Sequence, residues 1–294
     1  MRVAITGSTG LIGSALVQAL RWGGDDVVRF VRHEARGTDE RQIFPDQRRI
    51  ADPGLMDVDA VVNLAGTAIA GGRWTDSRKR GILESRISMT ETIVGALSAD
   101  GRCQRFISGS AIGYYGQTGD RAVDESAPAG DDFLAGVVVA WEKAASAAPV
   151  PTAYVRSGHV MTPRGGYIGA QLLPFKLGLG GQVADGKHWV SWVSLDDEVA
   201  AIRWLLRNEV TGPVNITAPE PVTNARWTKA IGAALRRPTV IPLPLPIPRL
   251  LFGNEFVDEA MLSSQKVLPG RLTEGGFTFG DTQIEPALMR LLRE

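Results

Sequence analysis

The sequence predicts an α/β protein with a doubly wound parallel sheet and a smaller, interleaved C-terminal α/β region. Two observations carry this prediction. Strand-like and helix-like segments alternate through the first two-thirds of the chain, a pattern typical of a parallel sheet covered by helices on both faces. The chain also opens on a β-branched run, residues 3–6, that leads directly into spaced glycines and an apolar-periodic helix.

The glycines of this opening segment stand at positions 7, 10 and 13. Gly7 permits a tight turn, Gly10 lets the backbone approach a pyrophosphate, and Gly13 lets the helix pack closely on the strand. The sequence therefore predicts a Rossmann-type dinucleotide-binding turn, whereas a purely structural glycine turn is the alternative. The expected cofactor contacts are Gly7, Ser8, Thr9, Gly10, Leu11, Ile12 and Gly13.

The other elements follow from hydrophobic periodicity along the chain. We expect strands at 27–31, 59–64, 105–108, 152–156 and 189–193, and helices at 78–97, 131–148, 172–177, 196–206 and 226–236. The proline-rich stretch 242–248 is expected to be non-helical, because proline removes a backbone donor and fixes φ. We interpret it as a rigid connector before terminal helices; a proline-rich recognition motif is the alternative.

Composition excludes several classes of protein. The 294 residues include 32 basic and 32 acidic side chains, which argues against a nucleic-acid-binding surface. Cys103 is the single cysteine, so no intrachain disulfide is expected, and the scattered histidines suggest no metal site. We expect no membrane span, because no run of about 18 apolar residues is present. A strand begins directly after Met1, which leaves no room for a signal peptide. These features together favour a cytoplasmic location.

The end of the second strand indicates which dinucleotide is bound. NAD-binding proteins of this architecture carry an acidic residue there, about 20 residues past the glycines, that accepts the adenosine ribose hydroxyls. This chain has Arg32 at that place and no carboxylate. Because a guanidinium suits a 2′-phosphate, the sequence favours NADP, although a solvated strand-end arginine is the alternative. Asp52 follows a third expected strand and is a candidate contact for the adenine amino group; a turn or cap role before Pro53 is equally compatible.

Four segments in order along the chain resemble landmarks of the extended short-chain dehydrogenase/reductase family, the NAD(P)-dependent epimerase/dehydratase group. They are residues 6–13, 63–66, 108–116 and 192–197. The chain is similar to an atypical branch labelled nucleoside-diphosphate-sugar epimerase or cell-division-inhibitor-like. The segments that carry this narrower resemblance are 72–74, 113–116, 173–181, 212–215 and 237–238.

The resemblance implies a division of the chain and several functional residues. An NADP-binding domain would span residues 1–160 and a substrate-binding region 161–294, with a family-specific segment at 238–294. Ser110 falls on the catalytic serine, which hydrogen-bonds the reacting oxygen, and Arg156 falls beside the nicotinamide. The residues expected to line the rest of the cofactor are Asn63, Leu64, Ala65, Gly66 and Arg86.

The chain departs from the family in its general acid/base, which is a tyrosine followed four residues later by a lysine. Residues four past the four tyrosines are Thr118, Gly119, Gly158 and Gln171, and the aligned pair falls on Leu134 and Val138. Three interpretations stay open. Tyr115, or its neighbour Tyr114, transfers the proton beside Ser110; or substrate groups or a distant residue supply it; or NADP is bound without turnover.

The sequence therefore predicts an NADP-dependent oxidoreductase or epimerase-like protein that acts on a small carbonyl or alcohol substrate, including a nucleotide-linked one. A catalytically inactive NADP-binding regulatory or sensor protein is the alternative. Glu142 and Lys143 are interpreted as packing or surface residues. No nucleic-acid or membrane partner is expected, and the sequence leaves a homodimer open.

Overall fold

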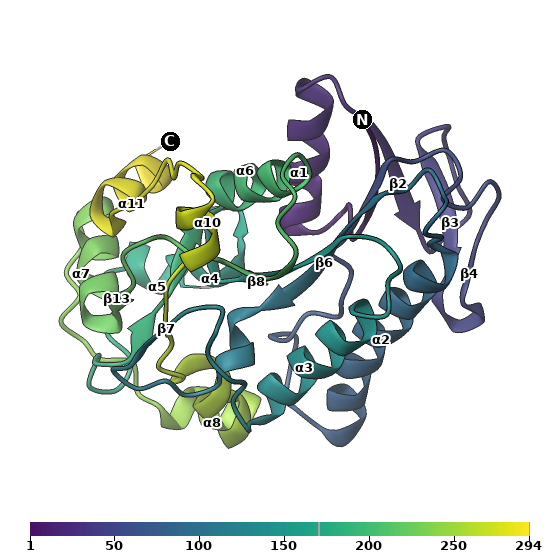
Figure 1. The fold of residues 1–294 in the computed structure, drawn as a ribbon. Helices are drawn as coiled ribbons and strands as arrows, with labels where there is room; N and C mark the ends of the chain where they lie inside the picture. Colours follow the sequence, from purple (N-terminus) through teal and green to yellow (C-terminus); the bar gives the residue numbers. More distant parts are fainter. Residues whose placement is uncertain (170, 294) are drawn as a thin grey trace.

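The computed structural model describes residues 1–169 and 171–293 and has a large sheet at its centre (Figure 1). The sheet has eight strands in the order β12-β8-β6-β5-β1-β2-β3-β4, and every pairing is parallel except that of β3 with β4. This arrangement confirms the predicted α/β fold class. The strands are β1 Arg2–Thr6, β2 Asp26–Val31, β3 Glu40–Phe44, β4 Arg49–Ile50, β5 Ala60–Asn63, β6 Arg105–Ala111, β8 Thr152–Ser157 and β12 Gly212–Ile216.

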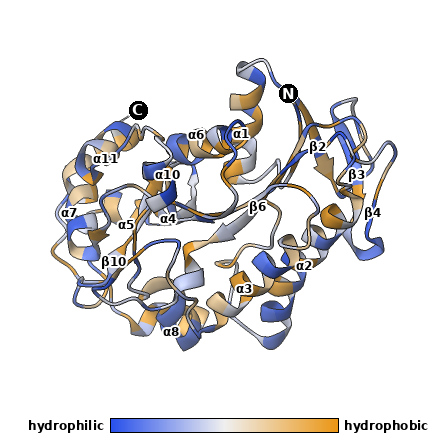
Figure 2. Cartoon of the chain, in the orientation of Figure 1, coloured by the Kyte–Doolittle hydropathy of each residue, from blue (hydrophilic) through white to orange (hydrophobic). Residues whose placement is uncertain are grey.

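Helices cover both faces of this sheet because successive strand residues point to opposite sides and both sides are apolar. Ile5 packs into a core with α1 and α6, whereas its neighbour Ala4 packs into a second core with α2 and the end of α3. Figure 2 shows hydrophobic residues along β2 and both hydrophobic and hydrophilic residues along α2. The helices are α1 Leu11–Trp22, α2 Asp76–Ala96, α3 Phe133–Ala145 and α6 Leu195–Leu205.

The C-terminal region is interleaved with the sheet, since the chain leaves the sheet after β8 and returns to it with β12. A separate core, which contains Trp192 and Trp227, holds its helices α7 and α11 together. The smaller elements are β7 Ala122–Val123, β9 His159–Thr162, α4 Gly166–Gly169, α5 Leu172–Lys176, β10 Trp189–Val190, β11 Trp192–Ser194, β13 Val222–Thr223, α7 Asn224–Leu235, α8 Pro246–Phe252, α9 Asn254–Phe256, η3 Val257–Met261, β14 Lys266–Val267, α10 Gly270–Glu274 and α11 Ile284–Arg293, besides η1 Pro45–Gln47 and η2 Ile112–Tyr115.

Two expectations for this region are wrong. The single strand expected at 189–193 is broken at Ser191, so that β10 pairs with β13 and β11 pairs with β9. The Ser191 hydroxyl donates to the Gln265 carbonyl at 2.8 Å and accepts from the Val267 amide at 2.8 Å, which compensates for the interruption. The stretch 242–248 is helical from Pro246 onward, because a proline in the first helical turn gives up an amide that has no intrahelical partner.

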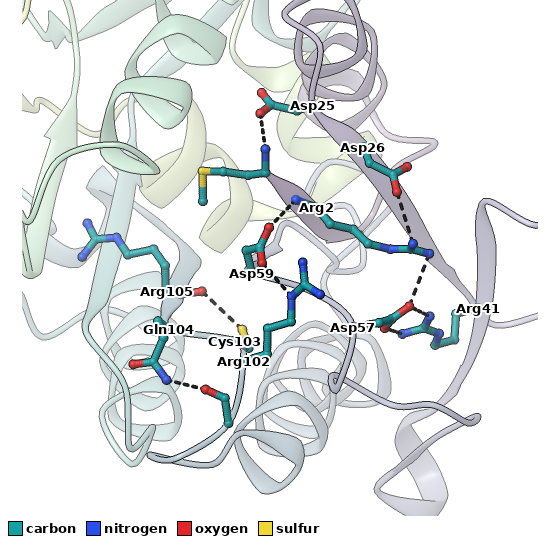
Figure 3. Close-up of polar contacts among 12 residues, drawn as sticks. Arg2, Asp25, Asp26, Arg41, Asp57, Asp59, Arg102, Cys103, Gln104 and Arg105 are labelled. Atoms are coloured by element: carbon teal, nitrogen blue, oxygen red, sulfur yellow. Dashed lines mark hydrogen bonds and ion pairs between the residues drawn. The ribbon is translucent and has the colours of Figure 1, made fainter.

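The amino edge of the central sheet is closed by ion pairs (Figure 3). Asp57 pairs with Arg41 at 2.8 Å and with Arg2 at 3.3 Å. Asp59 accepts from the Arg102 guanidinium at 2.8 Å and from the Arg2 amide at 2.6 Å. These partners hold the pKa values of Asp57 and Asp59 below their usual range. The charged groups of this edge are paired with one another, and the residues expected to be functional lie mainly at the opposite, carboxyl edge.

None of the described helices is both long and apolar enough to cross a membrane.

Candidate cofactor and active site

The turn between β1 and α1 needs its glycines for steric reasons. Gly7 has φ +65°, and a Cβ there would lie 2.7 Å from the Leu64 carbonyl oxygen. A Cβ on Gly13 would lie 2.1 Å from the Gly7 carbonyl oxygen, so only glycine lets α1 approach the strand this closely. Gly10 is the N-cap of α1 and offers no capping side chain. The amides of the first helical turn are therefore available to an anion, and the turn fits a phosphate-bearing ligand.

A cleft of about 580 Å³ opens beside this turn. Thr9, Gly10 and Leu11 line it on the α1 side. Arg164, in the connection between β9 and α4, and Gly166, the first residue of α4, also line it. Thus a segment more than 150 residues away in the sequence completes the wall around the glycine turn.

The expected adenosine contacts lie in different places. Arg32 directly follows β2, the strand next to β1, at the carboxyl edge of the sheet, and it is exposed. Asp52 follows β4, which runs antiparallel to β3, so the chain there heads back toward the amino edge. This direction does not support the adenine contact expected for Asp52, which lies exposed in a turn. The segment that leaves the carboxyl end of β3 is Pro45–Gln47, and the sequence pattern did not single it out.

Asn63 ties the ends of two strands to a helix. Its side-chain oxygen accepts from the Thr6 hydroxyl at 2.6 Å and its amide donates to the Thr90 hydroxyl at 2.9 Å. Both bonds are buried, so the Asn63 side chain holds β1, β5 and α2 in register. The backbone of Leu64 and Ala65 then lies against Gly7 and forms the wall next to the turn.

Arg86 of α2 is a buried cation without a carboxylate partner among the described residues. Its guanidinium donates to the carbonyls of Thr67 and Ile82, at 3.1 and 2.9 Å, and lies 5.1 Å from the Trp141 ring centroid. Burial lowers the pKa of Arg86 to about 10. The guanidinium also lies beside Gly66, where a Cβ would be 3.1 Å from its central carbon. Such an uncompensated charge beside Gly66 suits an anionic ligand.

Ser110 lies at the carboxyl end of β6 in a buried polar network. Its hydroxyl donates to a Glu142 carboxylate oxygen at 2.6 Å. Arg156, the partner of Ser110 on the neighbouring strand β8, donates twice to the same carboxylate at 2.8 Å each. The side chains of Arg156 and Glu142 are only 3% and 11% exposed. The Arg156 guanidinium is therefore committed to the protein interior, which does not favour direct contact with a nicotinamide.

Tyr115 belongs to the same network. Its hydroxyl accepts from Arg156 at 2.9 Å and donates to the Asn215 side-chain oxygen at 2.7 Å. Burial raises the pKa of Tyr115 to about 12. The proton of the Tyr115 hydroxyl is thus donated to a group inside the protein. This geometry does not favour the expected proton transfer from Tyr115 to a substrate. Tyr114 is the more exposed of the two tyrosines, and the Arg156 guanidinium stacks 3.4 Å from its ring centroid.

Glu142 is a site residue that sequence reasoning missed. It stands four residues after Val138 and eight after Leu134, so all three lie on one stripe of α3. The two earlier positions are those at which the resemblance to the family implies the usual tyrosine and lysine. The helical spacing could have indicated Glu142, because it places this carboxylate one turn after Val138 on the same side of α3.

A second missed carboxyl group is Glu198 in the first turn of α6. It is fully buried and accepts from the Ser157 hydroxyl at 2.6 Å, at the carboxyl end of β8. Its other oxygen has no partner among the described residues. Burial raises the pKa of Glu198 to about 8, and burial also lowers the pKa of nearby His159, two residues after Ser157, to about 4.

Comparison with known protein families agrees with this geometry. Residues 3–217 match the NAD-dependent epimerase/dehydratase family. The chain belongs to that family. Residues 243–291 match a domain of unknown function, DUF1731, which follows the family domain. The resemblance inferred from the sequence motifs is therefore confirmed.

Relatives cover nearly the whole chain. An epimerase family protein of Mycobacterium bovis is 43% identical over 290 residues, which is 97% of this chain and 96% of that protein. The crystal structure of the human epimerase family protein SDR39U1, isoform 2, with NADPH superimposes with a TM-score of 0.92 at 33% identity over 100% of both chains. The structure of a nucleoside-diphosphate sugar epimerase from Corynebacterium glutamicum gives a TM-score of 0.81 at 33% identity and covers 99% of this chain and 58% of that one.

Proposed function

We propose that the protein binds NADP(H) and transfers hydride between it and a small alcohol or carbonyl compound. The observation that carries the proposal is the position of Ser110. It lies at the carboxyl edge of the sheet that presents the glycine turn, where ligands of open α/β sheets bind, and a buried carboxylate holds it.

The choice of NADP rests on two supports. Arg32 stands exposed after β2, where an acidic residue would bind the ribose hydroxyls of NAD. The similar human protein was crystallised with NADPH. The diphosphate would bind at Gly10 and the first turn of α1, the 2′-phosphate at Arg32, and Arg86 would offer positive charge beside Gly66.

In this mechanism Ser110 holds the reacting oxygen and Glu142 holds the proton. While it is paired with Arg156, the Glu142 carboxylate can only accept hydrogen bonds, so the Ser110 proton points toward it. Ser110 therefore presents a lone pair to the substrate and accepts the hydroxyl proton of an alcohol. As that proton arrives, the Ser110 proton moves to Glu142; carbonyl reduction reverses both transfers. The bound cofactor supplies the hydride acceptor or donor.

A sensor that binds NADP(H) without turnover is the second candidate. It is favoured by the apolar side chains of Leu134 and Val138 and by the engaged hydroxyl of Tyr115. Nucleotide sugars remain a candidate substrate class because the similar Corynebacterium protein is called a nucleoside-diphosphate sugar epimerase. The proposal also retains the expected cytoplasmic location and leaves the homodimer open.

The Ser110→Ala variant separates these candidates. NADPH affinity and NADPH oxidation are measured with a panel of small aldehydes, ketones and nucleotide sugars, and exposed Ser146→Ala is the control. An enzyme that uses Ser110 loses about 10²-fold in turnover with NADPH affinity unchanged, as for loss of one oriented donor or acceptor. Equal turnover in both variants contradicts the role of Ser110. If the wild type binds NADPH but turns over no member of the panel, the result supports the sensor.

A further inference from the structure

The connection between β9 and α4 forms a short, well-supported turn. Antiparallel bridges join Met161 to Gly166 and Thr162 to Gly165, and Arg164 is one of the two residues at the tip. The Arg164 amide donates to the buried Thr162 hydroxyl at 3.4 Å, which ties the tip to its own strand. The position of the Arg164 backbone is therefore set by the hairpin.

This hairpin is packed against the glycine turn. Gly166 has φ +63°, and a Cβ there would lie 3.0 Å from a methyl carbon of Leu11, the first residue of α1. Gly165 approaches the other Leu11 methyl carbon, since a Cβ on Gly165 would lie 3.6 Å from it. Glycine at these positions brings the hairpin to the N-terminus of α1, so Arg164 and Gly10 line the same cleft.

The Arg164 guanidinium makes no ion pair or hydrogen bond with any of the described residues. Three arginines of the C-terminal region are neutralised by carboxylates, namely Arg226 by Glu220 and Glu285, Arg249 by Asp258, and Arg290 by Asp196 and Asp281. Arg203, Arg236, Arg237 and Arg271 also lack an ion pair among the described residues, but none of them lines the cleft. The first turn of α1, Leu-Ile-Gly-Ser, also contains no carboxylate. An arginine without a counter-charge thus lines the cleft opposite helix amides that suit an anion.

We propose that Arg164 clamps the diphosphate of the bound dinucleotide against the first turn of α1. The inference rests on the proposed NADP(H) binding and adds a residue from the C-terminal region to the cofactor site. A guanidinium can donate two hydrogen bonds to one phosphate group, so the hairpin and the helix would hold the diphosphate from opposite sides. The cofactor thereby links the two parts of the chain.

The two arginines of the site have separable roles. Arg32 follows β2, which adjoins β1 directly, whereas Arg164 follows β9, which pairs with β11 outside the central sheet. The 2′-phosphate belongs to NADP(H) alone, but the diphosphate is common to NADPH and NADH. Loss of Arg164 therefore lowers the affinity for NADPH and for NADH by the same factor, whereas loss of Arg32 lowers the affinity for NADPH alone.

The test measures dissociation constants of NADPH and NADH for the full chain, by calorimetry, in the wild type and in Arg164→Ala and Arg164→Lys. Arg121→Ala, at an exposed arginine outside the cleft, is the matched control. We expect Arg164→Ala to raise both constants by about tenfold, the value of one charge-assisted contact, with their ratio unchanged. Arg164→Lys is expected to recover part of the loss, and the melting temperature to stay constant.

Unchanged affinities in Arg164→Ala overturn the clamp while leaving the proposed function standing. A loss confined to NADPH also overturns it, because Arg164 would then bind the 2′-phosphate. Failure of the wild type to bind either dinucleotide refutes the proposed function and the clamp together.

Discussion

The buried carboxyl of Glu198 makes the stability of this protein depend on pH in a defined way. The side chain is fully buried and has one hydrogen bond, from Ser157, while its second oxygen has no partner among the described residues. Burial disfavours the charged form and raises the pKa to about 8 in the folded protein, against an ordinary value of 4.5. The folded state therefore keeps a proton that the unfolded chain releases.

The sign and size of the effect follow from this difference. The contribution of Glu198 to stability is fully present below about pH 4.5 and declines as the pH rises toward 8, because the unfolded chain alone gains from ionisation. Each pH unit in this range costs about 1.4 kcal/mol. Between pH 4.5 and 7.5 the free energy of unfolding therefore falls by about 4 kcal/mol at most. If the pKa in the folded protein is one unit lower, the fall is smaller, so we expect about 2–4 kcal/mol.

Glu198→Gln is the perturbation that isolates this term, since glutamine keeps the shape and the acceptor for Ser157 but carries no titrating proton. The free energy of unfolding is measured in urea between pH 5 and pH 8 for the wild type, for Glu198→Gln and for the exposed control Glu209→Gln. The stability of Glu198→Gln relative to wild type should rise steadily with pH, whereas the control should follow the wild type. Parallel pH profiles for Glu198→Gln and wild type would show that the pKa of Glu198 is not raised in the folded protein.

Three further predictions concern the site itself. Glu142→Gln leaves Arg156 buried without a counter-charge and should lower the free energy of unfolding by about 3 kcal/mol, measured in urea; a loss below about 1 kcal/mol contradicts the buried ion pair. Gly13→Ala should abolish NADPH binding in calorimetry, because the new methyl group would clash with the Gly7 carbonyl. Retained affinity would show that this turn does not bind the cofactor. Tyr115→Phe should reduce turnover far less than Ser110→Ala does, and an equal loss would restore Tyr115 as the proton donor.

Local sequence patterns predicted the parts of the fold that depend on local sterics. The strand–glycine–helix unit that begins at residue 3 formed as expected, because Gly7 adopts φ +65° in the turn and Gly13 approaches the Gly7 carbonyl within the same turn. The proline-rich stretch was misjudged at Pro246, where the first turn of a helix tolerates proline. The strand at 189–193 was misjudged since its break at Ser191 depends on partners more than 70 residues away.

The site residues were predictable only where they belong to a local sequence motif. Ser110 was placed from its motif, but the carboxylate that holds it is 32 residues away on a helix, and no local pattern pairs the two. Arg156 was placed correctly on its strand, whereas its commitment to Glu142 is a tertiary contact. Asp52 was expected to follow a third strand and to contact the adenine, but β4 runs antiparallel to β3, a course that leads the chain away from the carboxyl edge and does not support the contact.

The glycine turn, together with Arg32, is proposed to bind NADP(H) in preference to NAD(H). This preference is measured as the ratio of the NADH and NADPH dissociation constants in the wild type and in Arg32→Gln. The wild type is expected to bind NADPH at least about tenfold more tightly, as for one charge-assisted phosphate contact, and the substitution is expected to remove most of this preference. Equal affinities in the wild type, or a preference that survives Arg32→Gln, would contradict this proposal.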